Sequence, residues 1–186
     1  MNVYDFDDTI YNGDSSAQFY IFCLKKQPFL IRLVPYQAYA MLLYLLKQID
    51  KTTMKTRFYC YMKHIDTDKR VSQFWDKNFI KIKSWYNDIH NTDDVIISAS
   101  PEFLLKPPCD RLGIKYLLGS VVDKNTGKYT GVNCWGEEKV RRFYEAFPNG
   151  VINDFYSDSL SDTPLFEIAK AGYIVKGNEL IKYSGS

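Results

Sequence analysis

Residues 2–10, NVYDFDDTI, are the stretch from which the rest of the chain is interpreted. Residues 3–6 have the character of a short buried strand, and an acidic loop follows them. Asp5 and Asp7 stand where this strand ends. If these carboxylates belong to a functional site, later segments of the chain must bring further polar side chains to the same end of the strand.

The chain after this strand shows no convincing strand pattern until about residue 90. Apolar side chains recur there at three- to four-residue spacing, which is typical of helices. Ser15 or Ser16 is placed to serve as N-cap of the first helix. We therefore predict an all-helical cap over residues 13–90, inserted into a core formed by residues 1–12 and 91–186.

Residues 28–46, PFLIRLVPYQAYAMLLYLL, form an unusually apolar stretch within the predicted cap. Arg32, Pro35 and Gln37 interrupt it, and the run over residues 38–46 is shorter than the ~20 residues that a membrane-spanning helix needs. We interpret the stretch as a packed helix that is kinked or restarts at Pro35. A helix that lies on a membrane surface is the alternative.

The second half of the chain alternates strand and helix patterns. Residues 94–98 are a continuous apolar run, as in a parallel sheet covered on both faces, and Ser100 with Pro101 predicts an N-cap and a helix start. Residues 116–122 and 128–132 are expected to pair as a hairpin, in which Gly127 takes positive φ.

Further elements complete the alternation. A helix is expected after Gly136 and another from Thr163 to Gly172, with strands over residues 151–156 and 173–175. This order predicts an α/β fold: a Rossmann-like parallel sheet core with helices on both faces, together with the inserted all-helical cap subdomain and a small β-hairpin.

The composition is that of a soluble globular protein. The net charge of +2 over 186 residues argues against a nucleic-acid partner, which would require a concentrated basic face. The four cysteines are widely spaced and form no C-x-x-C pair, so reduced thiols are expected rather than zinc ligands or disulfides. The first strand leaves no room for a secretory signal ahead of it, and we predict a cytoplasmic protein.

Polar side chains stand at the ends of several predicted elements: Asp5 and Asp7, Ser98, Lys139, and Asp158 with Asp162. Because the carboxyl ends of parallel strands share one edge, we expect these side chains to face one crevice. Carboxylates clustered there would repel one another without a cation, and an oxygen-only ligand set favours Mg²⁺ over zinc. Ser98 and Lys139 are donors suited to phosphate oxygens, so the sequence predicts a magnesium-assisted phosphate site.

Four segments then follow in order: DFDDT (5–9), VIISASP (95–101), CWGEEKV (134–140) and YSDSLSDTP (156–164). Together they resemble the four motifs of the haloacid dehalogenase-like hydrolase superfamily. They are especially similar to its phosphoserine-phosphatase-like branch, in which a helical cap lies between the first and second motifs. Four ordered motifs with an insertion of suitable length are much more specific than a lone D-x-D-x-T.

The resemblance implies a role for each aspartate. Asp5 would attack the phosphorus and form an aspartyl-phosphate. Asp7 would protonate the leaving oxygen and later deprotonate the attacking water. The carboxylates of Asp5 and Asp158 and the backbone carbonyl of Asp7 would hold Mg²⁺, and Asp162 would complete or orient that metal shell.

The resemblance also implies that Ser98 and Lys139 bind the transferring phosphoryl group. Lys124 and Lys128 are alternatives to Lys139, but they belong to the predicted hairpin, whereas Lys139 lies in the matching GEEK context.

Three further residues within the motif segments are expected to act on the loops in which they lie. Asp8 is expected to be a solvated turn residue, and Thr9 is expected to steady the loop. The chain departs from the family pattern at Ser157, where members often have glycine before the fourth-motif aspartate. The Ser157 side chain would either crowd that loop or add a hydrogen bond to it.

The expected activity is that of a Mg²⁺-dependent phosphatase acting on a small cytoplasmic phosphomonoester. Asp14 and Arg57 loosely match the positions at which phosphoserine phosphatases hold the amino and carboxylate groups of their substrate. A second hypothesis keeps the same centre but makes the substrate a phospholipid or lipid-precursor head group, with residues 28–46 touching the membrane. A non-enzymatic phosphoaspartate receiver is less favoured, because the region after the first strand is helical. The physiological substrate and the oligomeric state are not predicted.

Overall fold

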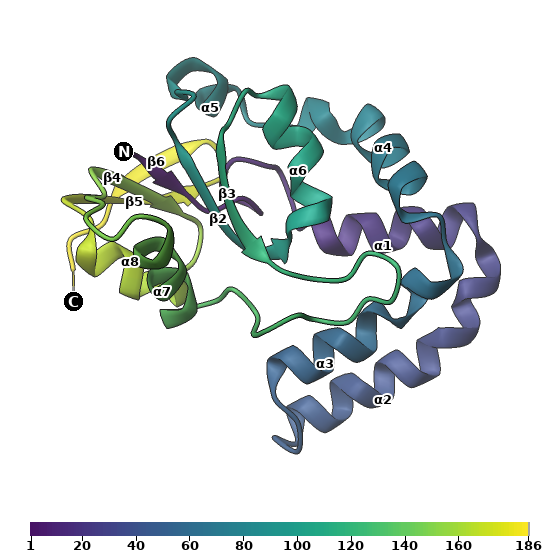
Figure 1. Ribbon diagram of the computed structural model, residues 1–186. Helices are drawn as coiled ribbons and strands as arrows, with labels where there is room; N and C mark the ends of the chain where they lie inside the picture. Colours follow the sequence, from purple (N-terminus) through teal and green to yellow (C-terminus); the bar gives the residue numbers. More distant parts are fainter. Residues whose placement is uncertain (186) are drawn as a thin grey trace.

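The computed structural model describes residues 1–185, which form a six-stranded sheet with helices on both faces (Figure 1). The strand order is β3-β2-β1-β4-β5-β6, and every neighbouring pair is parallel except β5 and β6. The strands are β1 (Val3–Tyr4), β2 (Val95–Pro101), β3 (Tyr116–Ser120), β4 (Asp154–Ser157), β5 (Ala171–Lys176) and β6 (Glu179–Lys182). The predicted Rossmann-like α/β core is confirmed, and β6 is a strand that the sequence analysis did not foresee.

The central strands separate two apolar layers, because successive residues of a strand point to opposite faces. Val3 pairs with Val95, and both lie in the layer covered by α7 (Glu137–Ala146) and α8 (Thr163–Ile168). Tyr4 pairs with Ile96 in the opposite layer, which α6 (Glu102–Arg111) covers. Both layers bury residues of β1, so this short strand is the centre of the core.

The chain between β1 and β2 is helical, as predicted. Its elements are α1 (Ser15–Lys26), the 3₁₀ helix η1 (Pro28–Leu33), α2 (Val34–Leu45), α3 (Lys51–Phe58), the 3₁₀ helix η2 (Tyr59–His64), α4 (Thr67–Asn78), the 3₁₀ helix η3 (Phe79–Lys81) and α5 (Ser84–Ile89).

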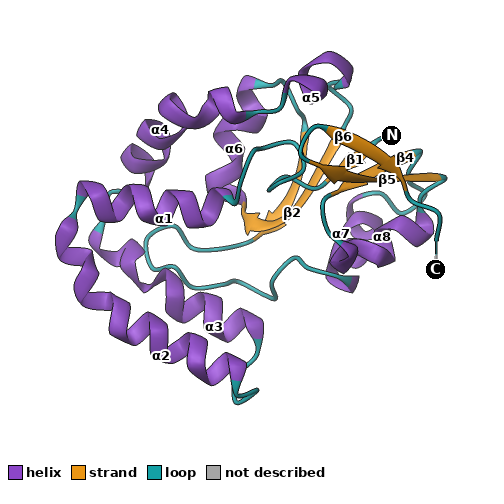
Figure 2. Cartoon of the chain, turned by 180° about the vertical axis from the view of Figure 1, so that it is seen from behind, coloured by secondary structure: helices purple, strands orange, loops and turns teal. Residues whose placement is uncertain are grey.

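The later helices of this insertion pack on the core. The Trp75 indole of α4 donates to the Leu104 carbonyl of α6 at 2.6 Å, and the Tyr86 ring of α5 meets the Tyr4 ring edge-on at 4.9 Å between centroids. In contrast, α2 and α3 pack mainly on each other and extend away from the sheet (Figure 2). The division into a core and a cap at residues 12–13 and 90–91 stays a prediction.

The N-cap of α1 is Asp14 rather than Ser15 or Ser16, so the sequence prediction was wrong here. Asp14 Oδ1 accepts the Ala17 backbone N–H at 2.8 Å, which satisfies one of the free donors at the helix start. Ser15 lies inside the helix and donates its own N–H to Asp7.

The second strand predicted for the hairpin, residues 128–132, is not formed. The pairing that the structure shows there is one antiparallel bridge between Val122 and Tyr129. Gly127 has a φ of 73°, as expected, but it lies against the helical insertion: a Cβ at this position would stand 2.1 Å from the Tyr59 carbonyl oxygen. The Asp123 N–H also donates to the Lys128 carbonyl and the Thr130 N–H to the Val121 carbonyl, both at 2.8 Å, so a short hairpin forms beyond the end of β3 and its turn packs against η2.

The helix expected from Thr163 to Gly172 is shorter than predicted. Helix α8 ends at Ile168, and Gly172 already pairs with Phe155 inside the sheet. A Cβ at Gly172 would stand 2.5 Å from the Phe166 ring, so this glycine lets α8 lie close to β5 instead of ending the helix.

The apolar stretch over residues 28–46 folds as η1 followed by α2. Helix α2 begins at Val34 and carries Pro35 in its first turn, so the predicted restart at Pro35 is confirmed to within one residue. Gln37 and Ala40 are its buried residues. Within residues 1–185, no helix combines the length and the apolar character needed to cross a membrane.

The four cysteines are free in the described chain, as expected. Burial raises the pKa of Cys23 and of Cys109 to about 12. These two thiols are therefore protonated apolar groups of the core rather than nucleophiles.

Candidate active site

Asp5 lies directly after β1, at the carboxyl edge of the sheet. Its backbone N–H donates to the Tyr156 carbonyl of β4 at 2.9 Å, which fixes the residue between two strand ends. Only 12% of the side chain is exposed. Burial raises the pKa of Asp5 to about 7, against the opposing effect of the Lys139 ammonium.

Asp7 is held by hydrogen bonds to both carboxylate oxygens. Its Oδ1 accepts the Ser15 N–H at 2.7 Å, and its Oδ2 accepts the Ser100 hydroxyl. The sequence analysis predicted Ser100 as the N-cap of α6, and this was wrong, because the N-cap is Pro101. The Ser100 hydroxyl donates to Asp7 instead. Burial and the nearby Asp14 raise the pKa of Asp7 to about 6, although its hydrogen bonds lower it. A carboxyl group that titrates near neutrality can both give and take up a proton.

The Lys139 ammonium links two of the aspartates. It donates to Asp5 Oδ1 at 2.8 Å and to Asp162 Oδ2 at 2.7 Å, and its side chain is 3% exposed. Lys139 lies in the first turn of α7, whose N-cap Gly136 has a φ of 58°. Burial by itself lowers the pKa of Lys139, but the two carboxylates outweigh it and the pKa is raised. The ammonium is therefore charged at neutral pH.

The loop after β4 presents Asp158 and Asp162. The Asp158 N–H donates to Thr9 Oγ1 at 2.9 Å, so Thr9 steadies this loop. Asp162 is buried, and its Oδ2 also accepts the Ser157 hydroxyl at 2.8 Å. Ser157 therefore adds a hydrogen bond to the loop where a glycine could not.

Ser98 is buried at the end of the apolar run of β2. Its Oγ accepts the Ser100 N–H at 3.1 Å, which orients the oxygen and leaves the hydroxyl proton for a ligand. Asp8 differs from the other aspartates: it is exposed, has a φ of 54°, and accepts the Gly13 N–H at 2.9 Å. It is a turn residue at the rim of the site, as expected.

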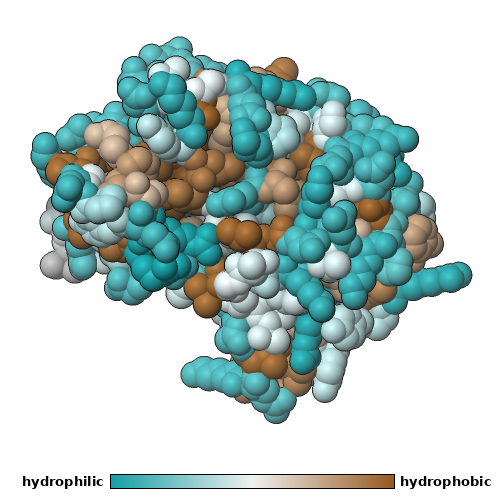
Figure 3. Space-filling view, in the orientation of Figure 1, coloured by the Kyte–Doolittle hydropathy of each residue, from teal (hydrophilic) through white to brown (hydrophobic). Residues whose placement is uncertain are grey.

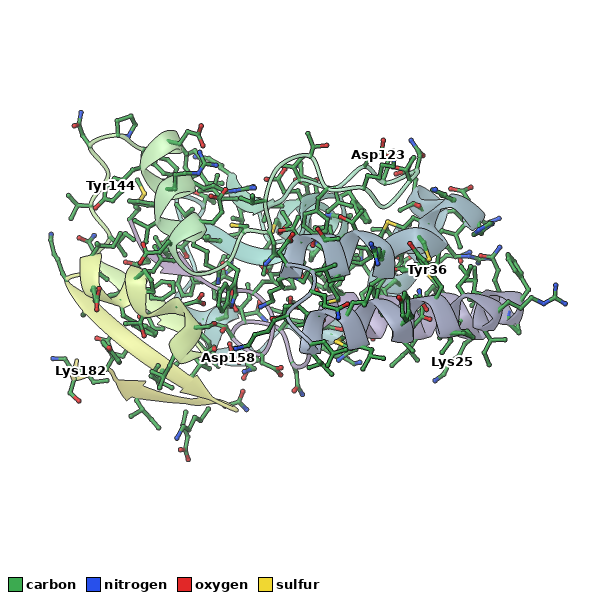
Figure 4. All side chains as sticks on the ribbon, turned by 90° about the horizontal axis from the view of Figure 1, so that it is seen from below. Lys25, Tyr36, Asp123, Tyr144, Asp158 and Lys182 are labelled. Carbon is green, nitrogen blue, oxygen red and sulfur yellow. The ribbon has the colours of Figure 1, made fainter. Side chains whose placement is uncertain are left out.

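These side chains open into a cavity of about 430 Å³ between the sheet edge and the helical insertion. The core side contributes the four site aspartates, Ser98 and Lys139. The helical side contributes Asp14, Ser16, Ala17, Met41, Lys51, Met54, Lys55, Phe58 and Tyr59. In Figure 4, Asp158 lies where the sheet half meets the helical half, whereas Tyr36 lies further along the helices.

Two lysines of α3, Lys51 and Lys55, line this cavity and were missed by the sequence analysis. Lys55 Nζ donates to the Ala99 carbonyl at 3.2 Å and to Asn133 Oδ1 at 2.8 Å, and burial lowers its pKa to about 8. Lys51 Nζ lies 4.1 Å from the Trp135 ring centroid. Their four-residue spacing in a helical segment was the available signal, because such residues share one helix face.

Of the two residues suggested for substrate specificity, Asp14 reaches the cavity wall and Arg57 does not. Lys124, which the sequence left as an alternative phosphate ligand, pairs with Asp68 at the surface and also lies outside the cavity. Lys55 therefore brings the positive charge of α3 toward the carboxylates, in the place where Arg57 was expected.

The oxygen donors of the site suit a hard divalent cation. Asp5, Asp158 and Asp162 supply carboxylates, and Oδ1 of the buried Asp162 has no hydrogen-bond partner within residues 1–185. In that part of the chain, no three Asp, Glu, His or Cys side chains are already close enough to enclose an ion. The donor set still fits Mg²⁺, because the ion prefers oxygen ligands and would reduce the repulsion among buried carboxylates.

Known protein families were compared with the sequence of this chain. The sequence profile of the family described as haloacid dehalogenase-like hydrolase matches residues 3–167. Comparison with curated protein sequences found no match.

Several solved structures share the fold. A protein of unknown function from Bordetella pertussis Tohama I superposes with a TM-score of 0.78 at 16% identity, over 94% of this chain and 88% of that one. A phosphoserine phosphohydrolase-like protein from Francisella tularensis subsp. tularensis SCHU S4 superposes with a TM-score of 0.61 at 16% identity, over 96% of this chain and 88% of that one. A probable phosphoserine phosphatase from Vibrio cholerae superposes with a TM-score of 0.60 at 12% identity, over 92% of this chain and 55% of that one.

The structural matches, at these identities, establish the fold, which is that of phosphoserine-phosphatase-like proteins. The profile match spans most of the chain and includes all four predicted motif segments. The resemblance predicted from those motifs is confirmed. The chain belongs to the haloacid dehalogenase-like hydrolase family and is a hydrolase.

Proposed function

We propose that the chain is a Mg²⁺-dependent phosphatase that hydrolyses a small-molecule phosphomonoester through an aspartyl-phosphate on Asp5. The environment of Asp5 supports this most directly. Asp5 is a buried carboxylate that lines the cavity and accepts a hydrogen bond from the Lys139 ammonium at 2.8 Å. Asp7, with a pKa near 6, lines the same cavity. Phosphoryl transfer needs such a nucleophile, a proton donor and an ammonium in one place.

The proposed reaction has two displacements at phosphorus. Asp5 attacks first, the bond from phosphorus to the leaving oxygen breaks, and Asp7 gives that oxygen its proton. Water then attacks the phosphorus of the aspartyl-phosphate, Asp7 takes up a proton from it, and Asp5 is regenerated with release of inorganic phosphate. The raised pKa of Asp7 suits both of its steps.

Ser98 and Lys139 bind the phosphoryl oxygens in this proposal. The Ser98 oxygen is already oriented by the Ser100 N–H, and the Lys139 ammonium uses two of its three N–H groups on aspartates. The third N–H of Lys139 and the Ser98 hydroxyl proton remain for the charge that develops on phosphorus oxygens.

Mg²⁺ would be held by the carboxylates of Asp5, Asp158 and Asp162 and by the Asp7 carbonyl. When bound, it would neutralise phosphate charge and offset the repulsion among these carboxylates. The partnerless Asp162 Oδ1 supports a direct or water-mediated contact at that residue.

Lys51 and Lys55 suggest what the rest of the substrate carries. Both lysines line the cavity from α3, and Met54 and Phe58 of the same helix add apolar side chains to the lining. We assign to the substrate a second negative group, bound by these lysines, on a partly apolar body. The acidic Asp14 on the wall formed by α1 disfavours negative charge in that direction.

The test is hydrolysis of a panel of phosphomonoesters by wild-type protein and by Asp5→Asn, with Mg²⁺ and with EDTA. We expect turnover by the wild type with Mg²⁺ alone, and loss of turnover in Asp5→Asn. Asp8→Asn is the matched control, since Asp8 is an exposed turn residue whose acceptor oxygen the amide retains. Equal rates for wild type and Asp5→Asn would contradict the nucleophile assignment.

A further inference from the structure

The outer side of η1 and α2 exposes an unusual amount of apolar surface. Of the 21 large apolar side chains that are exposed in residues 1–185, nine lie within residues 29–46. Leu45 is 68% exposed, Ile31 65% and Leu46 58%. We define the apolar cap surface as Phe29, Ile31, Val34, Tyr36, Tyr39, Leu42, Leu45 and Leu46.

This surface does not have the pattern of an ordinary solvent-facing helix. Residues 33–46 contain no charged residue, and α2 buries Gln37 and Ala40 toward its neighbours while apolar side chains face outward. A helix that is apolar on all sides is normally enclosed by protein or lipid. Contiguous exposed apolar patches on soluble proteins mark interaction sites.

The charge around the surface indicates what covers it. Residues 15–64 contain eight Lys and Arg and a single acid, Asp50, whereas the whole chain has a net charge of only +2. The exposed Lys25, Lys26 and Arg32 flank one end of the surface and Lys47 the other. Within residues 1–185, none of these four forms a salt bridge.

We propose that the apolar cap surface binds a lipid bilayer that contains anionic phospholipids. Apolar side chains would enter the boundary between head groups and acyl chains, and the flanking basic residues would meet the head-group phosphates. A second copy of this chain is a poorer occupant, because it would bring two basic insertions face to face. In Figure 3, apolar residues reach the surface beside strongly hydrophilic ones in the lower part of the molecule, where Figure 1 shows α2 and α3.

The surface adjoins the cavity. Met41 belongs to α2, is 41% exposed, and also lines the cavity that contains the site aspartates. Docking would thus hold the cavity mouth against the head groups. This consequence rests on the proposed function: it makes the substrate a phosphomonoester carried on a membrane lipid, with its second negative group at Lys51 and Lys55.

The experiment is flotation with vesicles of phosphatidylcholine alone and of phosphatidylcholine mixed with phosphatidylserine, without substrate. We expect the protein to float with the mixed vesicles and much less with the neutral ones. Raising the salt from about 0.1 M to about 1 M, which shortens the Debye length from ~10 Å to ~3 Å, should reduce the binding.

The double variant Leu42→Glu, Leu45→Glu tests the surface itself. We expect its partition onto mixed vesicles to fall by at least about tenfold, since two apolar anchors become anions. Ile80→Glu is the matched control, because Ile80 is 88% exposed but lies in η3, outside the surface, and it should bind like wild type. Circular dichroism and thermal unfolding confirm that each variant folds.

Absence of flotation with mixed vesicles would overturn the proposal, as would equal loss in Ile80→Glu. If wild type forms a concentration-dependent dimer but binds no vesicles, and the double variant stays monomeric, the surface binds a second copy of the chain instead. Asp5→Asn should bind vesicles like wild type, so failure of the proposed chemistry and failure of membrane docking are distinguishable.

Discussion

Ser157 donates its hydroxyl to Asp162 Oδ2 at 2.8 Å, and Lys139 donates to the same oxygen at 2.7 Å. The buried carboxylate thus receives one neutral and one charged donor on one oxygen, while its other oxygen has no partner within residues 1–185. Ser157 therefore holds Asp162 in the orientation that turns the free oxygen away from Lys139.

Ser157→Ala should lower the free energy of unfolding by about 1–3 kcal/mol, because it removes a hydrogen bond to a buried charged group. Urea denaturation measures the change. Ser84→Ala is the control: Ser84 is exposed at the start of α5 and its change should stay within about 0.5 kcal/mol. Equal stability of the two variants would show that the Ser157 hydroxyl does not support Asp162.

Lys139→Ala should weaken vanadate binding far more than Lys124→Ala does. Lys139 is nearly fully buried between two site aspartates, whereas Lys124 is exposed and pairs with Asp68 outside the cavity. Lys139→Ala should also cost about 3–5 kcal/mol of stability, since it leaves buried carboxylates without their cation. Titration with vanadate, alongside urea denaturation, separates the two effects. The reverse ranking of the lysines would move the phosphate ligand to the surface segment.

The lowered pKa of Lys55, about 8, predicts a pH dependence of substrate binding. For a phosphomonoester that also carries a carboxylate, KM should rise roughly tenfold as the pH passes upward through this value, because a charge-assisted hydrogen bond is lost. Lys55→Met should show a high KM without this rise, and Arg57→Met should behave like wild type. A KM that rises in Lys55→Met as in wild type would exclude Lys55 as the titrating group.

The same pKa makes a separate prediction for stability. The unfolded chain keeps the Lys55 proton to higher pH than the folded chain does, so it binds more protons between pH 8 and the ordinary lysine pKa of about 10.4. The free energy of unfolding of wild type, compared with that of Lys55→Met, should therefore increase with pH over this interval. Denaturation curves at several pH values check the sign.

Gly127→Ala should destabilise the protein more than Gly177→Ala. Both glycines have positive φ, 73° and 60°, so each variant carries a backbone cost of about 1–2 kcal/mol. A Cβ at Gly127 would also meet the Tyr59 backbone at 2.1 Å, whereas a Cβ at Gly177 meets nothing within 4 Å. The excess should be about 1–3 kcal/mol by urea denaturation. Equal costs would mean that the segment moves away from η2 freely.

The sequence predicted those parts of the fold whose signal is local. The apolar runs that became β1 and β2, each ending in polar residues, located Asp5, Asp7 and Ser98 at one sheet edge. Lys139 followed from its position after a glycine at a helix start. The placement of these residues was predicted correctly because the candidate site residues are next to the residues that define each element.

Features that depend on tertiary contacts were missed. Residues 128–132 have strand character, but the hairpin is limited to a bridge between Val122 and Tyr129, and Gly127 packs on Tyr59 of η2. Lys55 gained its place in the cavity from acceptors at Ala99 and Asn133, far away in sequence. The four-residue spacing of Lys51 and Lys55 indicates that they share a helix face, but it does not indicate which distant acceptors that face meets.

The two hydrogen bonds to Asp7 have a consequence for how the protein tolerates change. One donor, Ser15, is the first residue of α1 in the insertion, and the other, Ser100, lies near the end of β2 in the core. The acid strength of Asp7 is therefore a joint property of two segments that meet only in the folded chain. A substitution that moves one segment relative to the other would therefore change the pKa of Asp7 even if every side chain in the cavity were intact.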